Sequence, residues 1–300
     1  MSRAPFFPGF AVHDVPLGDA VIHAEVGGSG PPLLLLHGYP QTHVAWHRIA
    51  PTLARHFTVI APDLRGYGDS TGPAGDPLHV NHSKRTLAAD KLALMRALGF
   101  TRFAVMGHDR GARVGYRLCL DSPEAVNCFV SLTVVPTEEM WKRAGMAFGL
   151  KAFHWYLFAQ PFDLPERMLR ADPAYYLDWA LRNAVQKVDA VTPQALAEYH
   201  RAFAKESVRH AIVEDYRAAA SIDLQHDRDD LAAGRRIACP VQVLWSASNT
   251  AKPDPLEIWK TWADEVEGGT IDCGHQMAEE APDEVLARVL PFLLRHARSA

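Results

Sequence analysis

An aspartate between two glycines stands where a tight turn could present it for chemistry. Residues 107–111 read Gly-His-Asp-Arg-Gly and lie between an apolar run and a helical pattern. The spacing matches the G-x-S-x-G nucleophile elbow, with Asp109 in the place of the serine. The glycines permit a sharp turn that lifts the central side chain above a sheet. Asp109 alone would be interpreted as a helix N-cap, but the glycines and the segments below favour a nucleophile.

Two further segments could supply partners for this aspartate. Residues 37–40 read His-Gly-Tyr-Pro directly after an apolar run, and Gly274-His275 follow the last apolar run of the chain. A histidine after the last strand, with the nucleophile earlier, has the chain order of hydrolases that use a histidine base. Because the chain holds 15 histidines, the position of His275, and not its residue type, makes it the candidate general base.

Arg110 and Arg113 are candidates for binding an anion. They lie three residues apart on an expected helix, so both side chains can share one face. They also lie in its first turn, where a positive charge is disfavoured by about 0.3–1 kcal/mol. Arginine binds carboxylates in a bidentate manner, and a carboxylate in the site would explain both. A solvent-exposed stripe that continues to Arg117 is the alternative.

The elements that must position these residues alternate along the first half of the chain. Apolar runs at 21–26, 33–36, 57–61, 103–106 and 129–135 predict strands, and the patterns at 43–56, 83–98 and 110–121 predict helices. Uniformly apolar strands are typical of a parallel sheet covered on both faces. The alternation predicts an α/β fold with a mostly parallel, doubly wound sheet.

The character of the sequence changes between residues 136 and 234. This segment is rich in aromatics and helix formers, contains several prolines and shows no strand pattern. Strand patterns resume at 241–245 and 270–273, with helices expected near 256–265 and 283–298. We therefore expect a core formed by residues 1–135 and 235–300, interrupted by a helical lid over 136–234.

Composition excludes several classes of function. The 300 residues are 48% hydrophobic and 22% charged, with a net charge of −4. This leaves no basic excess to bind nucleic acid, and no apolar run reaches the roughly 20 residues of a membrane span. The four cysteines form no CxxC pair, and no P-loop, dinucleotide motif or signal-peptide pattern is present. We expect a cytoplasmic protein without a cofactor or metal.

These motifs together resemble the fluoroacetate dehalogenases, α/β hydrolases that cleave the carbon–fluorine bond of small haloacids. The resemblance extends over nearly the whole chain. It is carried by Asp109, Arg110, Arg113, His154-Trp155 and the Glu-Asp-Tyr-Arg segment at 214–217. Residues 107–113 are its specific part, since epoxide hydrolases and other dehalogenases share His-Gly-x-Pro. It implies the α/β-hydrolase fold, a small anionic haloacid substrate bound by Arg110 and Arg113, and a homodimer.

The resemblance also implies the two steps of the reaction. Asp109 would displace the halide from a saturated carbon and form an ester, and His275 would activate the water that hydrolyses it. The backbone N–H groups of Tyr39 and Arg110 would form the oxyanion hole.

The leaving halide needs hydrogen-bond donors, and the resemblance places them in the lid. His154, the indole N–H of Trp155 and the hydroxyl of Tyr216 would form this halide pocket. Without the resemblance, the aromatic run around Trp155 would be interpreted as lid packing, and Tyr216 as part of an amphipathic helix.

The triad acid that should orient the histidine is missing from both of its usual positions. In the resembled family it follows the strand before the lid, where this chain has Thr133. Related hydrolases place it after the strand that follows the lid, where Asn249 stands. We hypothesise that Asn249, or a displaced acid among Glu138, Glu139 and Asp254, orients His275, and we expect slow hydrolysis of the ester.

Two other functions remain open. An epoxide hydrolase would use the same nucleophile, with Tyr216 and Tyr156 or Tyr175 protonating the opening oxygen. A protein that binds small acids without turnover would explain the missing acid. The arginine pair favours the dehalogenase over the epoxide hydrolase, because a neutral epoxide has no use for it.

Overall fold

The structure of the protein is a computed structural model, which describes residues 6–297. Eight strands form one sheet in the order β1-β2-β4-β3-β5-β6-β7-β8. Only β1 and β2, and β2 and β4, pair antiparallel; every other neighbouring pair is parallel. The strands are β1 (Ala11–Leu17), β2 (Ala20–Gly28), β3 (Pro32–Leu36), β4 (Thr58–Pro62), β5 (Phe103–His108), β6 (Val126–Leu132), β7 (Val241–Ser246) and β8 (Val266–Ile271).

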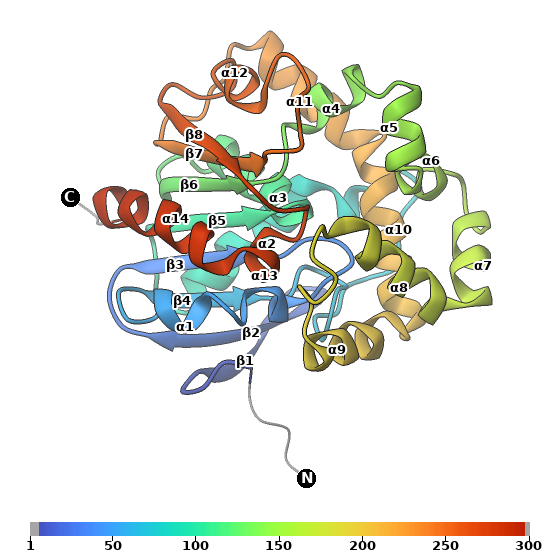
Figure 1. Ribbon diagram of the computed structural model, residues 1–300, viewed down its shortest axis with the longest axis horizontal. Helices are drawn as coiled ribbons and strands as arrows, with labels where there is room; N and C mark the ends of the chain where they lie inside the picture. The colour runs from blue at the N-terminus through green and yellow to red at the C-terminus, as the bar shows by residue number, and fades with distance from the viewer. Residues whose placement is uncertain (1–5, 298–300) are drawn as a thin grey trace.

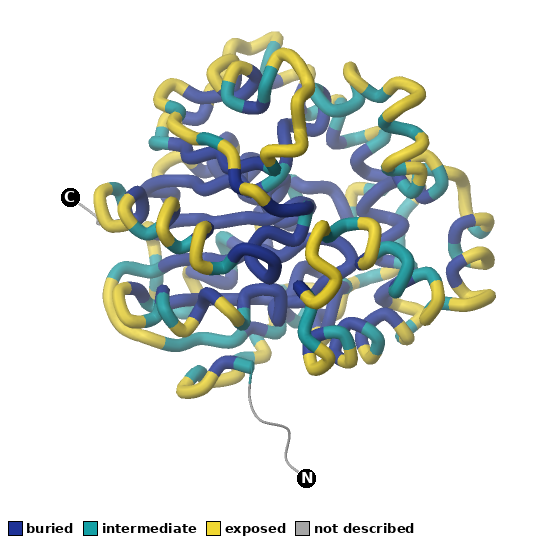
Figure 2. The backbone as a smooth tube through the Cα atoms, in the orientation of Figure 1, coloured by how far each residue is buried: buried dark blue, intermediate teal, exposed yellow. Residues whose placement is uncertain are grey.

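The central strands form the core of the molecule. Every residue of β5 and β6 is buried, as apolar parallel strands require when helices cover both faces of a sheet. Figure 1 shows α14 in front of the sheet and α2 and α3 behind it, and Figure 2 shows the strands between them in the buried colour. The helices of the core are η1 (His43–Trp46), α1 (Ala50–Leu53), η2 (Val80–His82), α2 (Lys84–Ala97), α3 (Arg110–Asp121), α12 (Pro255–Trp259), α13 (Met277–Glu280) and α14 (Pro282–His296).

Only helices and loops lie between β6 and β7 among the described residues. Figure 1 shows this helical insertion, coloured green through orange, beside the sheet at the end where the parallel strands finish. Its helices are α4 (Thr137–Lys142), α5 (Met146–Lys151), α6 (His154–Phe158), α7 (Leu164–Ala171), α8 (Pro173–Ala184), α9 (Pro193–Phe203), α10 (Glu206–Ala219) and α11 (Ile222–Ala232). Within residues 6–297, no helix is both long and apolar enough to cross a membrane.

The predicted fold class is confirmed, while several element boundaries differ. The strand expected to reach residue 135 ends at Leu132, because Thr133 adopts a left-handed backbone with φ 72°. The helix expected over 43–56 is split into η1 and α1, and Pro51 begins the second piece. The last strand lies earlier than the expected 270–273, and β1 has no counterpart in the prediction because its half-exposed residues form no apolar run.

Candidate active site

Asp109 occupies a strained turn between β5 and α3. Its backbone has φ 47° and ψ −116°, a conformation that costs a non-glycine residue roughly 1–3 kcal/mol and is common at functional sites. The flanking glycines allow it. A Cβ on Gly111 would lie 2.1 Å from the carbonyl oxygen of Leu36, and one on Gly107 would lie 2.5 Å from the Cα of Ala112. The elbow geometry therefore depends on both glycines.

The register of the sheet places the carboxyl ends of the parallel strands β3, β5 and β6 side by side at one edge. Leu36 of β3 pairs with Gly107 of β5, and His108 pairs with Leu132 of β6. The segments that follow these strands carry Tyr39, Asp109 and Thr133. In open α/β sheets this edge is where ligands bind.

Asp109 contacts two of its predicted partners. The backbone N–H of Tyr39 donates to its Oδ2 at 3.0 Å, and His275 Nε2 lies 3.7 Å from its Oδ1. Burial alone would raise the pKa of Asp109, but the neighbouring imidazole of His275 and the charge of Arg110 hold it well below its usual range. The carboxylate is therefore ionised, as a nucleophile must be. The N–H of Arg110, the second predicted oxyanion donor, makes no hydrogen bond among the described residues.

His275 is held by its backbone. Its N–H donates to the carbonyl oxygen of Ala184 at 2.6 Å, and its carbonyl oxygen accepts the Nε2–H of His108 at 2.8 Å. Burial lowers the pKa of His108 to about 3, so this ring is neutral. Within residues 6–297, the only carboxylate in contact with the His275 ring is Asp109 itself.

Thr133 is the residue at which the resemblance leads us to expect a triad acid, and within residues 6–297 its hydroxyl has no hydrogen-bond partner. Its backbone N–H donates to the carbonyl oxygen of Leu244 at 2.8 Å. Its Oγ1 is buried and has no hydrogen-bond partner among the described residues. A buried polar group without a partner is uncommon and costs about 1–3 kcal/mol.

The hypothesis that Asn249 or a displaced acid orients His275 is not supported, because none of the four side chains contacts that ring in the described structure. The side chain of Asn249 is exposed, and its Oδ1 accepts the N–H of Ala251 at 3.2 Å. The three acids have other partners: Glu138 binds Arg228, Glu139 binds Arg143 and Asp254 caps α12.

Asp215 was missed by the sequence analysis and fixes the side chain of Arg110. Both carboxylate oxygens accept from Arg110, Oδ2 from Nε and Oδ1 from Nη2, each at 2.8 Å. Asp215 also binds Lys84 and the hydroxyl of Tyr67. Burial opposes the charge of Arg110, but Asp215 raises the pKa of its guanidinium. A buried arginine requires a counter-charge, and the acidic segment at 214–217 was the available signal.

Arg113 is buried, and no described residue supplies a counter-charge for it. Its Nη1 donates to the carbonyl oxygen of Val135 at 2.9 Å and to Thr137 Oγ1 at 3.1 Å, and its Nε has no partner among the described residues. It forms no ion pair in this part of the chain. Burial, followed by the like charge of Arg110, lowers the pKa of its guanidinium. Arg113 is therefore a cation still able to accept an anionic partner.

The three predicted halide donors lie together above this arginine pair. The Tyr216 ring covers the Arg110 guanidinium at 4.1 Å, and the Trp155 ring covers that of Arg113 at 4.8 Å. His154 lies 5.5 Å from Tyr216 between ring centroids and stacks on Tyr39 at 5.3 Å. Burial lowers the pKa of His154 to about 4, so the ring is neutral. Burial and then the charge of Asp109 raise the pKa of Tyr216, which keeps its hydroxyl protonated.

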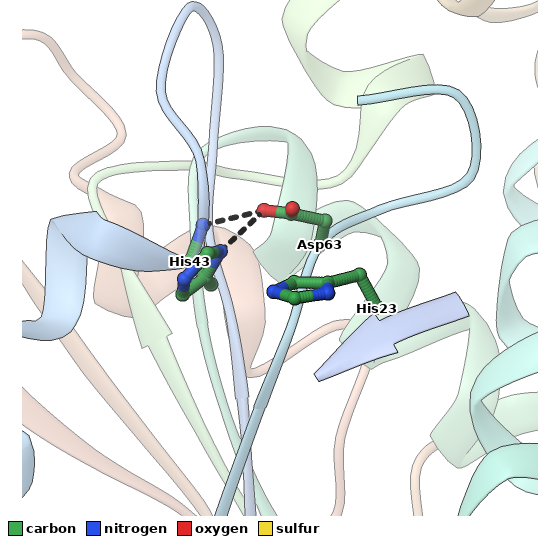
Figure 3. Close-up of side chains that lie close together, drawn as sticks. All are labelled: His23, His43 and Asp63. Carbon is green, nitrogen blue, oxygen red and sulfur yellow. Dashed lines mark hydrogen bonds and ion pairs between the residues drawn. The ribbon is translucent and has the colours of Figure 1, made fainter. Parts of the chain in front are cut away.

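Two clusters have ligand types that bind metals, but protein groups already satisfy them. In the first, His23, His43 and Asp63 converge (Figure 3). There Asp63 Oδ1 accepts the backbone N–H of His43 at 2.8 Å and contacts its Nδ1 at 2.9 Å, while Oδ2 accepts the N–H of Asp69. The second comprises Glu166, His210 and Glu214, and the guanidinium of Arg217 binds both of its carboxylates. In the second cluster the Arg217 guanidinium would repel a metal cation.

Comparison with known proteins identifies relatives across the whole fold. Residues 31–282 match the family model described as alpha/beta hydrolase fold. The chain is 39% identical over 297 residues to a fluoroacetate dehalogenase from a Burkholderia species, covering 98% of this chain and 96% of that protein. It is 31% identical to a soluble epoxide hydrolase from Corynebacterium sp. strain C12, covering 93% and 96% of the two chains. The resemblance stated from the motifs is confirmed.

A solved structure is also similar over nearly the whole chain. It is a threonine-to-aspartate variant of a protein from Pseudomonas aeruginosa, named as an epoxide hydrolase, with bound MFA. The two chains are 54% identical, each is covered to 98%, and the TM-score is 0.94.

Proposed function

The chain belongs to the alpha/beta hydrolase family, and from that premise we propose that it is a hydrolytic dehalogenase of small 2-haloacids such as fluoroacetate or chloroacetate. One observation carries the proposal: Arg113, three residues after the nucleophile, is 1% exposed and has neutral hydrogen-bond partners only. A buried cation without a counter-charge is costly, and a substrate carboxylate would supply the missing charge. The first curated relative, a fluoroacetate dehalogenase, supports the same substrate class.

In the first step, a carboxylate oxygen of Asp109 attacks the carbon that bears the halogen. A carbon–oxygen bond forms as the carbon–halogen bond breaks, and the halide leaves with the bonding electron pair. Arg113 holds the substrate carboxylate, while Arg110 stays bound to Asp215. The helical insertion, residues 136–234, acts as a lid that supplies the halide donors His154, Trp155 and Tyr216.

In the second step, His275 takes a proton from water, and the oxygen attacks the carboxyl carbon of Asp109. The N–H of Tyr39, already aimed at the carboxylate, stabilises the oxyanion. The bond between the carboxyl carbon of Asp109 and the alkyl oxygen then breaks, and the protonated His275 returns its proton to that oxygen, which releases the hydroxyacid. Asp109 loses its remaining proton and is restored as a carboxylate. The halide, a proton and the hydroxyacid account for all atoms of the haloacid and the water.

This second step is slow in the proposed mechanism. No carboxylate other than Asp109 contacts His275 in the described part of the chain. In the serine-protease template, replacement of the triad Asp by Asn costs about 10⁴-fold in kcat. Thr133 stands where the resembled family has the acid. An alkyl-enzyme on Asp109 should therefore accumulate.

Epoxide hydrolysis with the same nucleophile is the second candidate, and the tyrosines near Asp109 favour it. The hydroxyls of Tyr39 and Tyr176 lie 3.2 Å apart, and Tyr216 packs against Tyr39. The other tyrosines considered from the sequence serve less well, since Tyr175 is 65% exposed and the hydroxyl of Tyr156 donates to Ala144. On the family resemblance, we also propose a homodimer located in the cytoplasm.

The test is incubation of the purified protein with fluoroacetate and then chloroacetate, measuring free halide and the intact protein mass. One halide per protein with a carboxymethyl group on Asp109 supports the nucleophile and the slow second step. Many halides per protein support the dehalogenase and refute the slow step. No halide and no adduct from either acid refutes the haloacetate proposal, and diol formation from a small epoxide would then support the second candidate.

A further inference from the structure

Helix α11 buries acidic side chains where a lid helix would normally bury apolar ones. Asp223, Asp227 and Asp230 are each at most 2% exposed, and their spacing of four and three residues places them on one helix face. Two of them have cationic partners, since Asp223 binds Lys84 and Asp230 binds Arg117. Asp227 differs, because its nearest cation, Arg117 Nη1, lies 4.0 Å away.

The hydrogen bonds of Asp227 lead to Tyr116 of α3. The Tyr116 hydroxyl lies 3.0 and 2.9 Å from the two carboxylate oxygens of Asp227. The same hydroxyl lies 3.1 Å from Thr137 Oγ1 and accepts the backbone N–H of Thr137 at 3.3 Å. The backbone N–H of Glu138 donates to Asp227 Oδ2 at 3.0 Å. Asp227 thus fixes both the tyrosine hydroxyl and the backbone that begins α4.

Thr137 connects this group to the substrate-binding arginine. Its Oγ1 accepts from Arg113 Nη1 at 3.1 Å, one of only two hydrogen bonds that orient this guanidinium among the described residues. The Tyr116 hydroxyl has one proton, and the carboxylate of Asp227 can only accept it. The Thr137 hydroxyl then donates its own proton to Tyr116, and its oxygen accepts the hydrogen bond from Arg113. Every donor in the series then points toward Asp227, an arrangement in which the hydrogen bonds strengthen one another.

We propose that Asp227, Tyr116 and Thr137 are positioning residues that set the orientation of Arg113 and thereby the affinity for the substrate carboxylate. We call these three residues with Arg113 the Asp227 network. The inference rests on the proposed function, in which Arg113 binds the haloacid. None of the three needs to touch the substrate, because each acts through the guanidinium of Arg113. The network joins the last helix of the insertion to the helix that begins at the nucleophile.

Kinetics with chloroacetate at pH 8 test the network. Tyr116→Phe and Thr137→Val each remove one hydroxyl of the series, and each should raise KM about fivefold or more with kcat within twofold. This split is expected because binding of the carboxylate is the same in the ground state and the transition state. Thr137→Ser retains the hydroxyl and should keep the wild-type KM.

Asp230→Asn is the matched control. It removes a buried carboxylate from the same face of α11 but leaves the Asp227 network intact, so KM should stay unchanged. If Tyr116→Phe and Thr137→Val lower kcat and leave KM unchanged, or if Asp230→Asn changes KM as much as they do, the residues have a structural role only and the inference is overturned.

A binding measurement separates failure of the network from failure of the proposed function. In an Asp109→Asn background, the Kd of acetate is measured by titration with and without Tyr116→Phe. A rise in Kd of about fivefold supports the network even if the wild type releases no halide, a result that would refute the dehalogenase alone. An equal Kd in the two proteins overturns the network, whatever the halide assay gives.

Discussion

Asp215 and Arg110 form a bidentate ion pair, in which both carboxylate oxygens accept hydrogen bonds from the guanidinium at 2.8 Å. The side chain of Arg110 is fully buried. The two arginines predicted to share one role are therefore unequal. Arg110 has its counter-charge within the protein, while Arg113, three residues later, has none within residues 6–297.

Substitution of these arginines should consequently give different phenotypes. Arg113→Gln should raise KM for chloroacetate about 10- to 100-fold, because the free energy of a hydrogen bond to a charged group corresponds to a factor of this size. The free energy of unfolding should change little. Arg110→Gln leaves Asp215 with Lys84 as its only cationic partner among the described residues, and breaking such a buried pair costs about 3–5 kcal/mol of unfolding free energy. Steady-state kinetics and urea denaturation of both variants check this. The reverse pattern, a stability loss at Arg113 and a KM effect at Arg110, would show that the assignment is inverted.

Thr133→Asp should accelerate hydrolysis of the ester. Aspartate tolerates a left-handed backbone better than most residues, and its carboxylate would stand at the position where the resembled family has the triad acid. The decay of the alkyl-enzyme, followed by intact mass after a chloroacetate pulse, should be at least tenfold faster than in the wild type. Thr133→Asn, of similar shape and without charge, should give no acceleration. Equal decay in Thr133→Asp and wild type, with both folded, would mean that His275 needs no acid here.

Asp227 should make the protein less stable as the pH rises from about 4 to 7. Burial raises the pKa of Asp227 to about 7, against about 3.9 in an unfolded chain. Between these values the folded state holds a proton that the unfolded state has released, so stability falls with pH, by up to about 4 kcal/mol. Asp227→Asn does not titrate. Its unfolding free energy in urea should change less between pH 5 and 7 than that of the wild type, whereas parallel curves would contradict the shifted pKa.

Sequence reasoning succeeded where local patterns determine structure. The glycines around Asp109 and the apolar runs before Tyr39 and His275 predicted which segments meet at the sheet edge. Pairings between side chains far apart in sequence left no such pattern. The partner of Arg110 lies 105 residues away in α10, and that of Tyr116 lies 111 residues away in α11. The difference between Arg110 and Arg113 is therefore visible only once the insertion has folded.

Acidic residues that are buried in the folded protein were the hardest to interpret from the sequence. Asp223, Asp227 and Asp230 give α11 no apolar stripe, although this face is buried. An acidic face predicts exposure from sequence, because buried acids are rare unless they are paired. Their partners come from α2 and α3, which the sequence placed in the core and not against this helix.

Tyr216→Phe should slow the release of fluoride more than that of chloride. Burial, followed by the charge of Asp109, raises the pKa of Tyr216 and so keeps its hydroxyl protonated. A phenylalanine ring can still cover Arg110. Fluoride concentrates its charge on a small ion and depends most on donors, and loss of one such donor costs about 10²–10³-fold in rate. The first-turnover rate should fall about 100-fold for fluoroacetate and several-fold for chloroacetate, as measured by rapid-quench halide release.

Tyr156→Phe is the matched control, because this neighbouring tyrosine is exposed and its hydroxyl donates to the carbonyl oxygen of Ala144. Both halides should leave this variant at the wild-type rate. An equal loss for fluoride and chloride in Tyr216→Phe would mean that the ring, and not the hydroxyl, is what the reaction uses. Unchanged release of both would remove Tyr216 from the halide pocket and leave His154 and Trp155 as its remaining donors.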